Sequence, residues 1–153
     1  MRTIDVPGAG SIRLANLVLD VNGTLTDRGT LIPGVADRLS RLANGLELHL
    51  LTADTFGTAG RVATELGLTV TPVSNGQQKA ELVESLGADA TAAVGNGRND
   101  EAMLRAARLG IAVIGPEGAA TATLVAATVV CRSVLDALDL LLDERALAAT
   151  LRP

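Results

Sequence analysis

Aromatic side chains are almost absent from this sequence, which has one Phe and no Trp or Tyr among its 153 residues. Hydrophobic residues nevertheless make up 48% of the chain, so a sizeable core can form from Leu, Val, Ile and Ala. Cysteine occurs once, at Cys131, which excludes an internal disulfide bond. No uninterrupted apolar run reaches the ~18–20 residues of a membrane-spanning helix, so we expect no membrane span.

Positive charge is also scarce, because the chain has 13 basic and 17 acidic residues and a net charge of −4. Nucleic acids and anionic membranes are bound largely through Lys and Arg, so we expect neither as a partner. Pro7 and Gly8 form a turn where a signal peptide would have its apolar segment. We therefore expect a cytoplasmic protein.

Lysine occurs only once, at Lys79, and the other 12 basic residues are arginines. Lys79 falls in the first turn of a helix predicted over residues 77–86, where a cation opposes the helix dipole unless it faces an anion. One interpretation is that a compact ammonium is needed there, and the other is chance. The single histidine, His49, has no partner cluster, which favours a structural role, and Phe56 is predicted to serve packing.

Short apolar runs alternate with amphipathic segments along the chain. We predict a strand ending at Asp20 and further strands at 46–51, 68–73, 90–94, 110–114 and 128–130. Helices are predicted at about 34–43, 56–66, 77–86 and 134–142, and Thr55 is predicted to cap the second of them. Two more helices are predicted to begin near Asn99 and after Gly118. Such alternation is typical of an α/β, three-layer, Rossmann-like fold with a central, mainly parallel sheet. We expect one domain over 1–153, with an N-terminal β-hairpin in 1–15, a core over 16–142 and a small hairpin flap near 26–30.

Asp20 directly follows the apolar run Leu17-Val18-Leu19 and precedes a turn containing Gly23. A carboxylate at the carboxyl end of a buried strand lies where open α/β sheets bind their ligands. It can coordinate a metal ion or attack a phosphoryl group. The alternative is an aspartate that only caps a turn, and this segment by itself leaves both interpretations open.

Polar residues follow other predicted strands in the same way, namely Thr52 after the second and Asn96 and Asp100 after the fourth. The carboxyl ends of parallel strands meet at one edge of a sheet, so these residues can converge with Asp20, and Lys79 joins them from the helix after the third strand. A carboxylate, a hydroxyl, backbone amides and an ammonium are suited to phosphoryl transfer. Oxygen ligands near a carboxylate suit Mg²⁺.

Four stretches resemble, in this order, the four motifs of the haloacid dehalogenase-like hydrolases: Asp20-Val21-Asn22-Gly23-Thr24-Leu25-Thr26, Thr52, Lys79 and Gly95-Asn96-Gly97-Arg98-Asn99-Asp100. Within that superfamily, residues 23–26 and 110–113 resemble the phosphorylation domain of P-type ATPases. The chain is thus similar, over residues 15 to about 142, to the small soluble P-type ATPase-like phosphatases.

The resemblance implies a role for each matched residue. Asp20 would be the nucleophile and a Mg²⁺ ligand, and Asn22, Thr52 and Lys79 would complete the catalytic set. The implied metal ligands are Asp20, the Asn22 carbonyl, Asn96 and Asp100, and the implied phosphate site consists of Gly23, Thr24, Thr52, Ala53 and Lys79.

Two residues depart from the family pattern. Asn22 stands where the phosphatases usually have an aspartate that acts as general acid and base, and Asn96 stands where they usually have an aspartate on the metal. An amide cannot exchange a proton, and losing general acid–base catalysis costs ~10²–10⁴ in rate. We therefore predict a Mg²⁺-dependent phosphatase of low activity, acting on small phosphate esters or acyl phosphates. The alternative is a degenerate relative that binds a metal, a phosphorylated ligand or a protein without turnover.

The spacing of the motifs bears on the shape of the site and on other families. The 32 residues from Asp20 to Thr52 and the 27 from Thr52 to Lys79 are taken up by predicted helices, a strand and the flap, which predicts that there is no cap domain. Because capless relatives often complete their site with a neighbouring subunit, we expect a homo-oligomer.

A receiver-type signalling domain has its motifs in a different order, and a dinucleotide fold would need a third glycine after Gly97.

Overall fold

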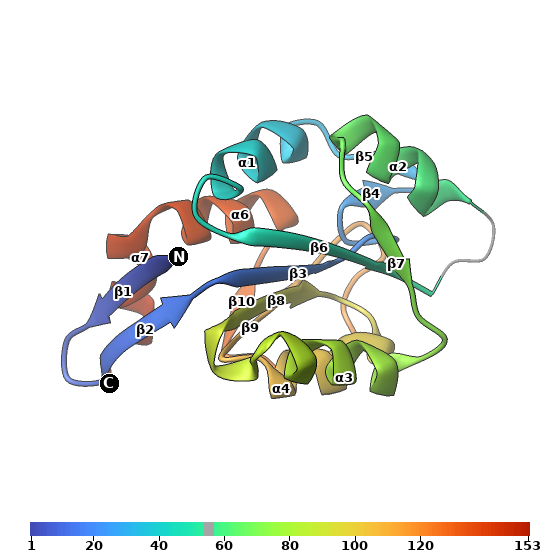
Figure 1. Cartoon of the computed structure of the whole chain (residues 1–153). Coiled ribbons are helices and arrows are strands. Elements are labelled where there is room, and N and C mark those ends of the chain that lie inside the picture. The colour runs from blue at the N-terminus through green and yellow to red at the C-terminus, as the bar shows by residue number, and fades with distance from the viewer. Residues whose placement is uncertain (54–56) are drawn as a thin grey trace.

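The computed structural model describes residues 1–53 and 57–153, and its central element is a six-stranded sheet (Figure 1). The strands are β3 (Asn16–Asp20), β6 (Glu47–Thr52), β7 (Val70–Pro72), β8 (Thr91–Gly95), β9 (Leu109–Val113) and β10 (Val129–Cys131). They lie in the order β10-β9-β8-β3-β6-β7, and every pair of neighbours is parallel. This confirms the predicted Rossmann-like fold. The strand that ends at Asp20 lies in the middle of the sheet.

Helices cover both faces of the sheet. The first face carries α1 (Val35–Leu42), α2 (Thr58–Leu66) and α6 (Val134–Leu142), and the second carries α3 (Gly76–Leu86), α4 (Glu101–Ala106) and α5 (Thr121–Ala126). Figure 1 shows α1 and α2 on one side of β3 and β6, with α3 and α4 on the other. Two 3₁₀ turns, η1 (Ala88–Ala90) and η2 (Arg98–Asp100), lie on either side of β8 in sequence.

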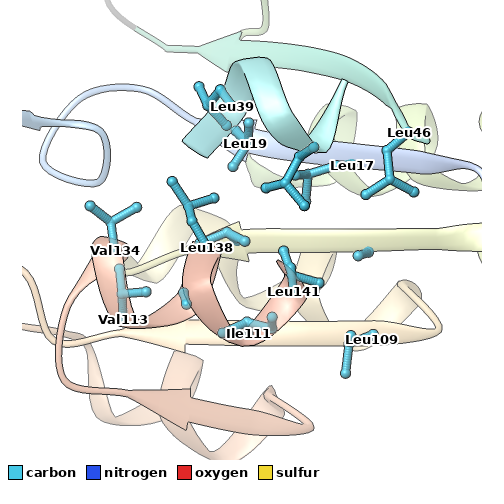
Figure 2. Packing of buried hydrophobic residues seen from close by; sticks show 14 of the residues in the cluster. Leu17, Leu19, Leu39, Leu46, Leu109, Ile111, Val113, Val134, Leu138 and Leu141 are labelled. Atoms are coloured by element: carbon cyan, nitrogen blue, oxygen red, sulfur yellow. The ribbon is translucent and has the colours of Figure 1, made fainter. Parts of the chain in front are cut away.

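The central strand β3 is buried on both faces, which is why its sequence is apolar without alternation. Leu17 and Leu19 belong to the core on the first face, and Val18 belongs to the core on the second face. Figure 2 shows Leu138 and Leu141 of α6 between Leu17 and Leu19 of β3 and the labelled side chains of β9. The aliphatic core is therefore divided by the sheet into two layers, and Asp20 emerges at the end of the strand between them.

Two small hairpins lie outside the central sheet, and both were predicted. β1 (Arg2–Val6) and β2 (Gly10–Leu14) pair antiparallel. β4 (Thr26–Asp27) and β5 (Thr30–Leu31) form the flap that follows the first motif. The flap turns at Arg28 and Gly29, whose φ values of 48° and 83° are those of a tight hairpin of mirror-image type.

A helix that was not predicted, α7 (Glu144–Leu151), follows α6. Asp143 caps it by accepting hydrogen bonds from the backbone N–H groups of Arg145 and Ala146. Its Leu147 is fully buried in the core of the first face, and Figure 1 shows the helix beside β1. The C-terminal residues are therefore part of the packed structure and close it against the N-terminal hairpin.

Two predictions about the segment after β6 cannot be compared with the structure. Thr55, predicted to cap α2, and Phe56, predicted to serve packing, lie outside the described residues. His49 of β6 has its Nε2 atom 3.2 Å from Oδ1 of Asn16 on the neighbouring strand, as expected for a structural histidine. In the parts of the chain that the structure describes, no helix has both the length and the apolar character to cross a bilayer.

Candidate active site

A cavity of about 420 Å³ opens at the carboxyl edge of the sheet, where β3, β6 and β8 end. It is lined by residues from three loops, together with Ala53 after β6: Asp20 and Asn22, then Asn96, Gly97 and Asn99, and finally Glu117, Gly118, Ala119 and Ala120. The first of these loops contains the first motif, and the second contains the fourth motif. The structure therefore brings Asp20, Asn22, Ala53 and Asn96 together around one space.

Lys79 links Asp20 to Asp100. The Lys79 ammonium donates to Oδ1 of Asp20 and to Oδ1 of Asp100, with both Nζ–O distances at 2.7 Å. The Lys79 side chain has no exposed surface, and it does not line the cavity. The sole lysine of the chain thus has a specific position, in which it bridges two carboxylates.

The start of α3 explains how Lys79 reaches this position. Asn75 caps the helix by accepting a hydrogen bond from the Gln78 N–H. The next residue, Gly76, packs against the η2 turn so closely that an added Cβ would lie 2.6 Å from the Asn99 carbonyl oxygen. One turn of helix places Lys79 three residues later under the loop that contains Asp100.

The three charges leave the site with one net negative charge, because two carboxylates surround one ammonium. Burial, together with repulsion by Asp100, raises the pKa of Asp20 from 3.8 to about 6, although Lys79 and Thr24 act in the opposite direction. Burial by itself would lower the pKa of Lys79, but Asp20 and Asp100 outweigh it and the pKa is raised. The lysine therefore stays charged, and the negative charge on Asp20 is only partly compensated.

Asp100 holds the loop after β8 in place. Its Oδ2 accepts from the backbone N–H groups of Asn96 and Gly97, both at 3.0 Å, while Oδ1 accepts from Lys79. Asp100 has no exposed surface and does not line the cavity. This geometry favours a role in positioning Lys79 and Asn96, and direct metal binding by Asp100 stays a prediction.

Asn96 and Asp20 share the hydroxyl group of Thr24. The Asn96 Nδ2 donates to the Gly118 carbonyl at 3.0 Å, which turns Oδ1 toward the Thr24 hydroxyl, also at 3.0 Å. That hydroxyl lies 2.9 Å from Oδ2 of Asp20. A threonine has one hydroxyl hydrogen, so it can donate to only one of the two oxygens at a time. The other oxygen is then available to a bound cation or to a water.

The donor set fits Mg²⁺. Asp20 supplies a carboxylate and Asn96 an amide oxygen on the cavity wall, and the Asn22 carbonyl belongs to the same loop. Among the described residues, no group of three or more His, Cys, Asp or Glu side chains is placed to hold a metal ion by itself, so a cation here would depend on amide and carbonyl oxygens and on water. Mg²⁺ is commonly bound by one or two carboxylates and retained waters.

Asn22 and Thr52 face one another across the ends of β3 and β6. Asn22 Nδ2 donates to the Thr52 hydroxyl at 3.1 Å, and Thr52 is buried. Gly23, the next residue, has a φ of 74°, which other residues adopt only under strain, and its N–H donates to the Thr26 hydroxyl. The predicted catalytic residues therefore form two hydrogen-bonded pairs at the same edge of the sheet, Asp20 with Lys79 and Asn22 with Thr52.

Glu117 lines the same cavity and was not predicted as a site residue from the sequence. The stretch Gly115-Pro116-Glu117-Gly118 comes directly before the helix predicted to begin after Gly118, and no site residue was predicted in it. Its position after a parallel strand was an available signal, since the same argument that selected Asp20 and Asn96 applies to the end of β9.

A family model described as haloacid dehalogenase-like hydrolase matches residues 9–108, which is most of the chain and includes all four motifs. Among curated proteins, an uncharacterized protein of Methanocaldococcus jannaschii is 53% identical over 60 residues. That match covers 39% of this chain and 64% of the relative, so the chain spans somewhat less than two thirds of the relative's length.

Solved structures share the fold over most of the chain. A putative hydrolase of the same superfamily, subfamily III A, from Legionella pneumophila has a TM-score of 0.73 at 20% identity, covering 92% of this chain and 88% of that one. A 3-deoxy-D-manno-octulosonate 8-phosphate phosphatase from Moraxella catarrhalis, solved with magnesium, phosphate and the sugar, has a TM-score of 0.64 at 23% identity, covering 91% and 94%. A zinc-transporting PIB-type ATPase reaches 31% identity and a TM-score of 0.66, covering 79% of this chain and 20% of that one.

Proposed function

Because the chain belongs to the haloacid dehalogenase-like hydrolases, we propose that it is a Mg²⁺-dependent phosphatase that works through an aspartyl phosphate on Asp20. One observation carries the proposal. The Asp20 carboxylate lies on the wall of a 420 Å³ cavity, with one oxygen held by Lys79 and the other by Thr24. A carboxylate fixed at both oxygens beside an open space is arranged for attack on a group bound in that space.

The chemistry assigned to Asp20 has two steps. A carboxylate oxygen of Asp20 forms a bond to phosphorus while the bond between phosphorus and the leaving oxygen breaks, and the leaving oxygen takes the electron pair. Water then attacks the phosphorus of the aspartyl phosphate, which releases inorganic phosphate and restores the carboxylate. Lys79 favours the ionised, nucleophilic form of Asp20, and Asp100 keeps the ammonium in place.

We assign the magnesium site to the Asp20 carboxylate, the Asn96 amide oxygen and the Asn22 carbonyl. When bound, the ion neutralises charge on the phosphoryl oxygens and orients them for in-line attack. The Thr24 hydroxyl, the Thr52 hydroxyl and the backbone N–H group of Ala53 are assigned to the phosphoryl oxygens, whereas the Gly23 N–H is engaged by Thr26. The Moraxella catarrhalis phosphatase, which shares the fold, was solved with magnesium and phosphate, and this supports the presence of a site for both.

Asn22 is the residue expected to make turnover slow. Its amide can hydrogen-bond to a leaving oxygen or to water, but it cannot give or take a proton. The aspartyl phosphate would then persist, which suits the likeness to the zinc-transporting PIB-type ATPase. Small phosphorylated compounds are the proposed substrates, and a homo-oligomer is the proposed assembly.

The alternative function is binding without turnover, and the two asparagines favour it. With Asn22 in place of an acid and Asn96 in place of a charged ligand, the cavity could hold a phosphorylated ligand or a cation as a sensor. The charged set of Asp20, Lys79 and Asp100 favours the enzyme, since binding alone does not require a buried lysine on the attacking carboxylate.

The test measures phosphate release with Mg²⁺ from a panel of phosphate esters and acyl phosphates, and uses mass spectrometry to look for a covalent phosphoryl adduct. We expect slow release and an adduct for the wild type, and neither for Asp20→Asn. Asn22→Asp should raise turnover by roughly 10²–10⁴, the usual range for general acid–base catalysis. Asp27→Asn, an aspartate of the flap outside the magnesium cavity, is the matched control. If no compound phosphorylates Asp20 and Asn22→Asp remains inactive, the binding function is favoured.

A further inference from the structure

Glu117 brings a second carboxylate to the cavity, besides Asp20. It follows β9, in a tight turn in which the Gly118 N–H donates to the Gly115 carbonyl at 2.9 Å. Within residues 1–53 and 57–153, no hydrogen bond or ion pair is made by the Glu117 carboxylate. A carboxylate at the cavity that has no such partner among the described residues can accept a ligand.

The turn that carries Glu117 is fixed against the first motif. An added Cβ on Gly115 would lie 2.8 Å from the Gly23 carbonyl oxygen, so the two backbones are in direct contact. An added Cβ on Gly23 would overlap the Glu117 carboxylate itself. Glu117 therefore lies beside the loop between Asp20 and Thr24, although its side chain is exposed to solvent.

The same turn is also fixed to Asn96. The Asn96 side chain donates to the Gly118 carbonyl at 3.0 Å, and the Ala120 N–H donates to the Asn96 carbonyl at 2.9 Å. A carboxylate at position 96 has no hydrogen to donate and would repel the Gly118 carbonyl. The amide that lowers the negative charge of the site is therefore also the group that holds Glu117 in place.

The buried charges of the site do not fully balance a divalent cation. Asp20, Asp100 and Lys79 sum to one negative charge, which leaves a divalent cation half neutralised. An aspartate at position 96 would supply the second negative charge, but the chain has Asn96 there. Glu117 restores the balance from another loop.

We propose that Glu117 supplies the second negative charge of the divalent-cation site, replacing the carboxylate that is missing at position 96. The inference rests on the proposed function and adds a residue to the same site. Glu117 contributes charge to the bound cation from the cavity wall, directly or through one of the cation's waters.

The test measures Mg²⁺ affinity by titration calorimetry on the full chain, without substrate. We expect Glu117→Gln to weaken Mg²⁺ binding by about tenfold, the lower end of what loss of a supporting carboxylate costs a metal site. Glu84→Gln makes the same change in net charge on an exposed residue of α3 outside the cavity, and it should bind Mg²⁺ like the wild type. Adding Asn96→Asp to Glu117→Gln should recover most of the lost affinity, because the charge returns at the other position.

The outcomes separate the inference from the proposed function. If Glu117→Gln binds Mg²⁺ within about twofold of the wild type while Asp20→Asn does not bind it, the role of Glu117 is wrong and the magnesium site stands. Unchanged Mg²⁺ affinity with slower phosphate release in Glu117→Gln would also overturn the proposed role of Glu117 in the cation site, because Glu117 would then act on the reacting groups. If Asp20→Asn binds Mg²⁺ as well as the wild type, the proposed magnesium site itself fails.

Discussion

In the absence of a cation, ionisation of Asp20 lowers the folding stability of the protein, because burial and Asp100 raise its pKa to about 6. In the unfolded chain its pKa is near 3.8. Between these values the folded protein binds a proton that the unfolded protein does not, so folding stability decreases as the pH rises from about 4 to about 6. The full cost, about 3 kcal/mol, is present above pH 6.

Asp20→Asn is therefore expected to be more stable than the wild type in the presence of a chelator, by up to about 3 kcal/mol above pH 6. The difference should shrink as the pH falls and should vanish below about pH 3, where the wild-type carboxyl is protonated in both states. Urea unfolding of the two proteins at a series of pH values measures it. An advantage of Asp20→Asn that is constant from pH 4 to pH 7 would contradict the explanation.

Lys79 gives a second prediction at this scale. Lys79→Met leaves two buried carboxylates without their cation, and breaking a buried pair in this way costs about 3–5 kcal/mol. Adding Asp100→Asn should recover part of that loss, since one of the unpaired charges is removed. Chemical unfolding at pH 7 measures both variants, and a Lys79→Met protein as stable as the wild type would show that the bridge does not hold the fold.

Individual residues were predictable where an unusual sequence feature matched a place in the fold. Asp20 was found because a charge directly follows a buried run, and Lys79 because it is the sole lysine in an arginine-rich chain. Glu117 and the holding role of Asp100 were not found. Both depend on contacts between loops far apart in sequence, such as Gly115 on Gly23, and local periodicity contains no information about such contacts.

At the scale of the elements, hydrophobic periodicity located the strands of the sheet and the helices between them, with ends that differ by a few residues. No helix was predicted after Leu142, although α7 follows there. The segment after Leu142 contains a capping residue, Asp143, and Leu147 and Leu151 four residues apart, all of which predict a helix. These signals were missed because α7 is rich in alanine and has only two large apolar residues.

The role of α7 can be tested at Leu147, which is fully buried between this helix and the rest of the core. Leu147→Ala should lower the free energy of unfolding by about 2–5 kcal/mol, as for other buried leucines. Thr150→Ala, an exposed position on the same helix, should change it by less than about 0.5 kcal/mol. Similar small effects for both variants would mean that α7 does not contribute to the packed core.

For the molecule as a whole, the site and the fold are linked through the sheet edge. A ligand that binds only the folded state stabilises the whole protein, by about 2.7 kcal/mol at one hundred times its dissociation constant. Mg²⁺ at that concentration should raise the melting temperature by roughly 5–10 °C, given the response typical of domains of this size. Differential scanning calorimetry with added Mg²⁺, and then with excess chelator, measures the shift.

The chelator should return the wild type to its starting melting temperature, and Asp20→Asn should not respond to Mg²⁺ at all. An equal rise in Asp20→Asn would mean that the ion stabilises the protein somewhere other than the proposed site. Loss of the response only in variants of the cavity would link the stability of the whole chain to this one edge of the sheet.

Asn22 and Asn96 are each followed by glycine, the sequence in which asparagine deamidates most readily to aspartate. That reaction begins with attack by the glycine nitrogen on the asparagine amide. In the fold both nitrogens are engaged, since the Gly23 N–H donates to Thr26 at 3.2 Å and the Gly97 N–H donates to Asp100 at 3.0 Å. The folded protein thus protects the two amides to which we assign the reduced charge of the site and its slow turnover. A preparation that has been unfolded or stored hot loses this protection, and both positions are then expected to convert to a mixture of aspartate and isoaspartate.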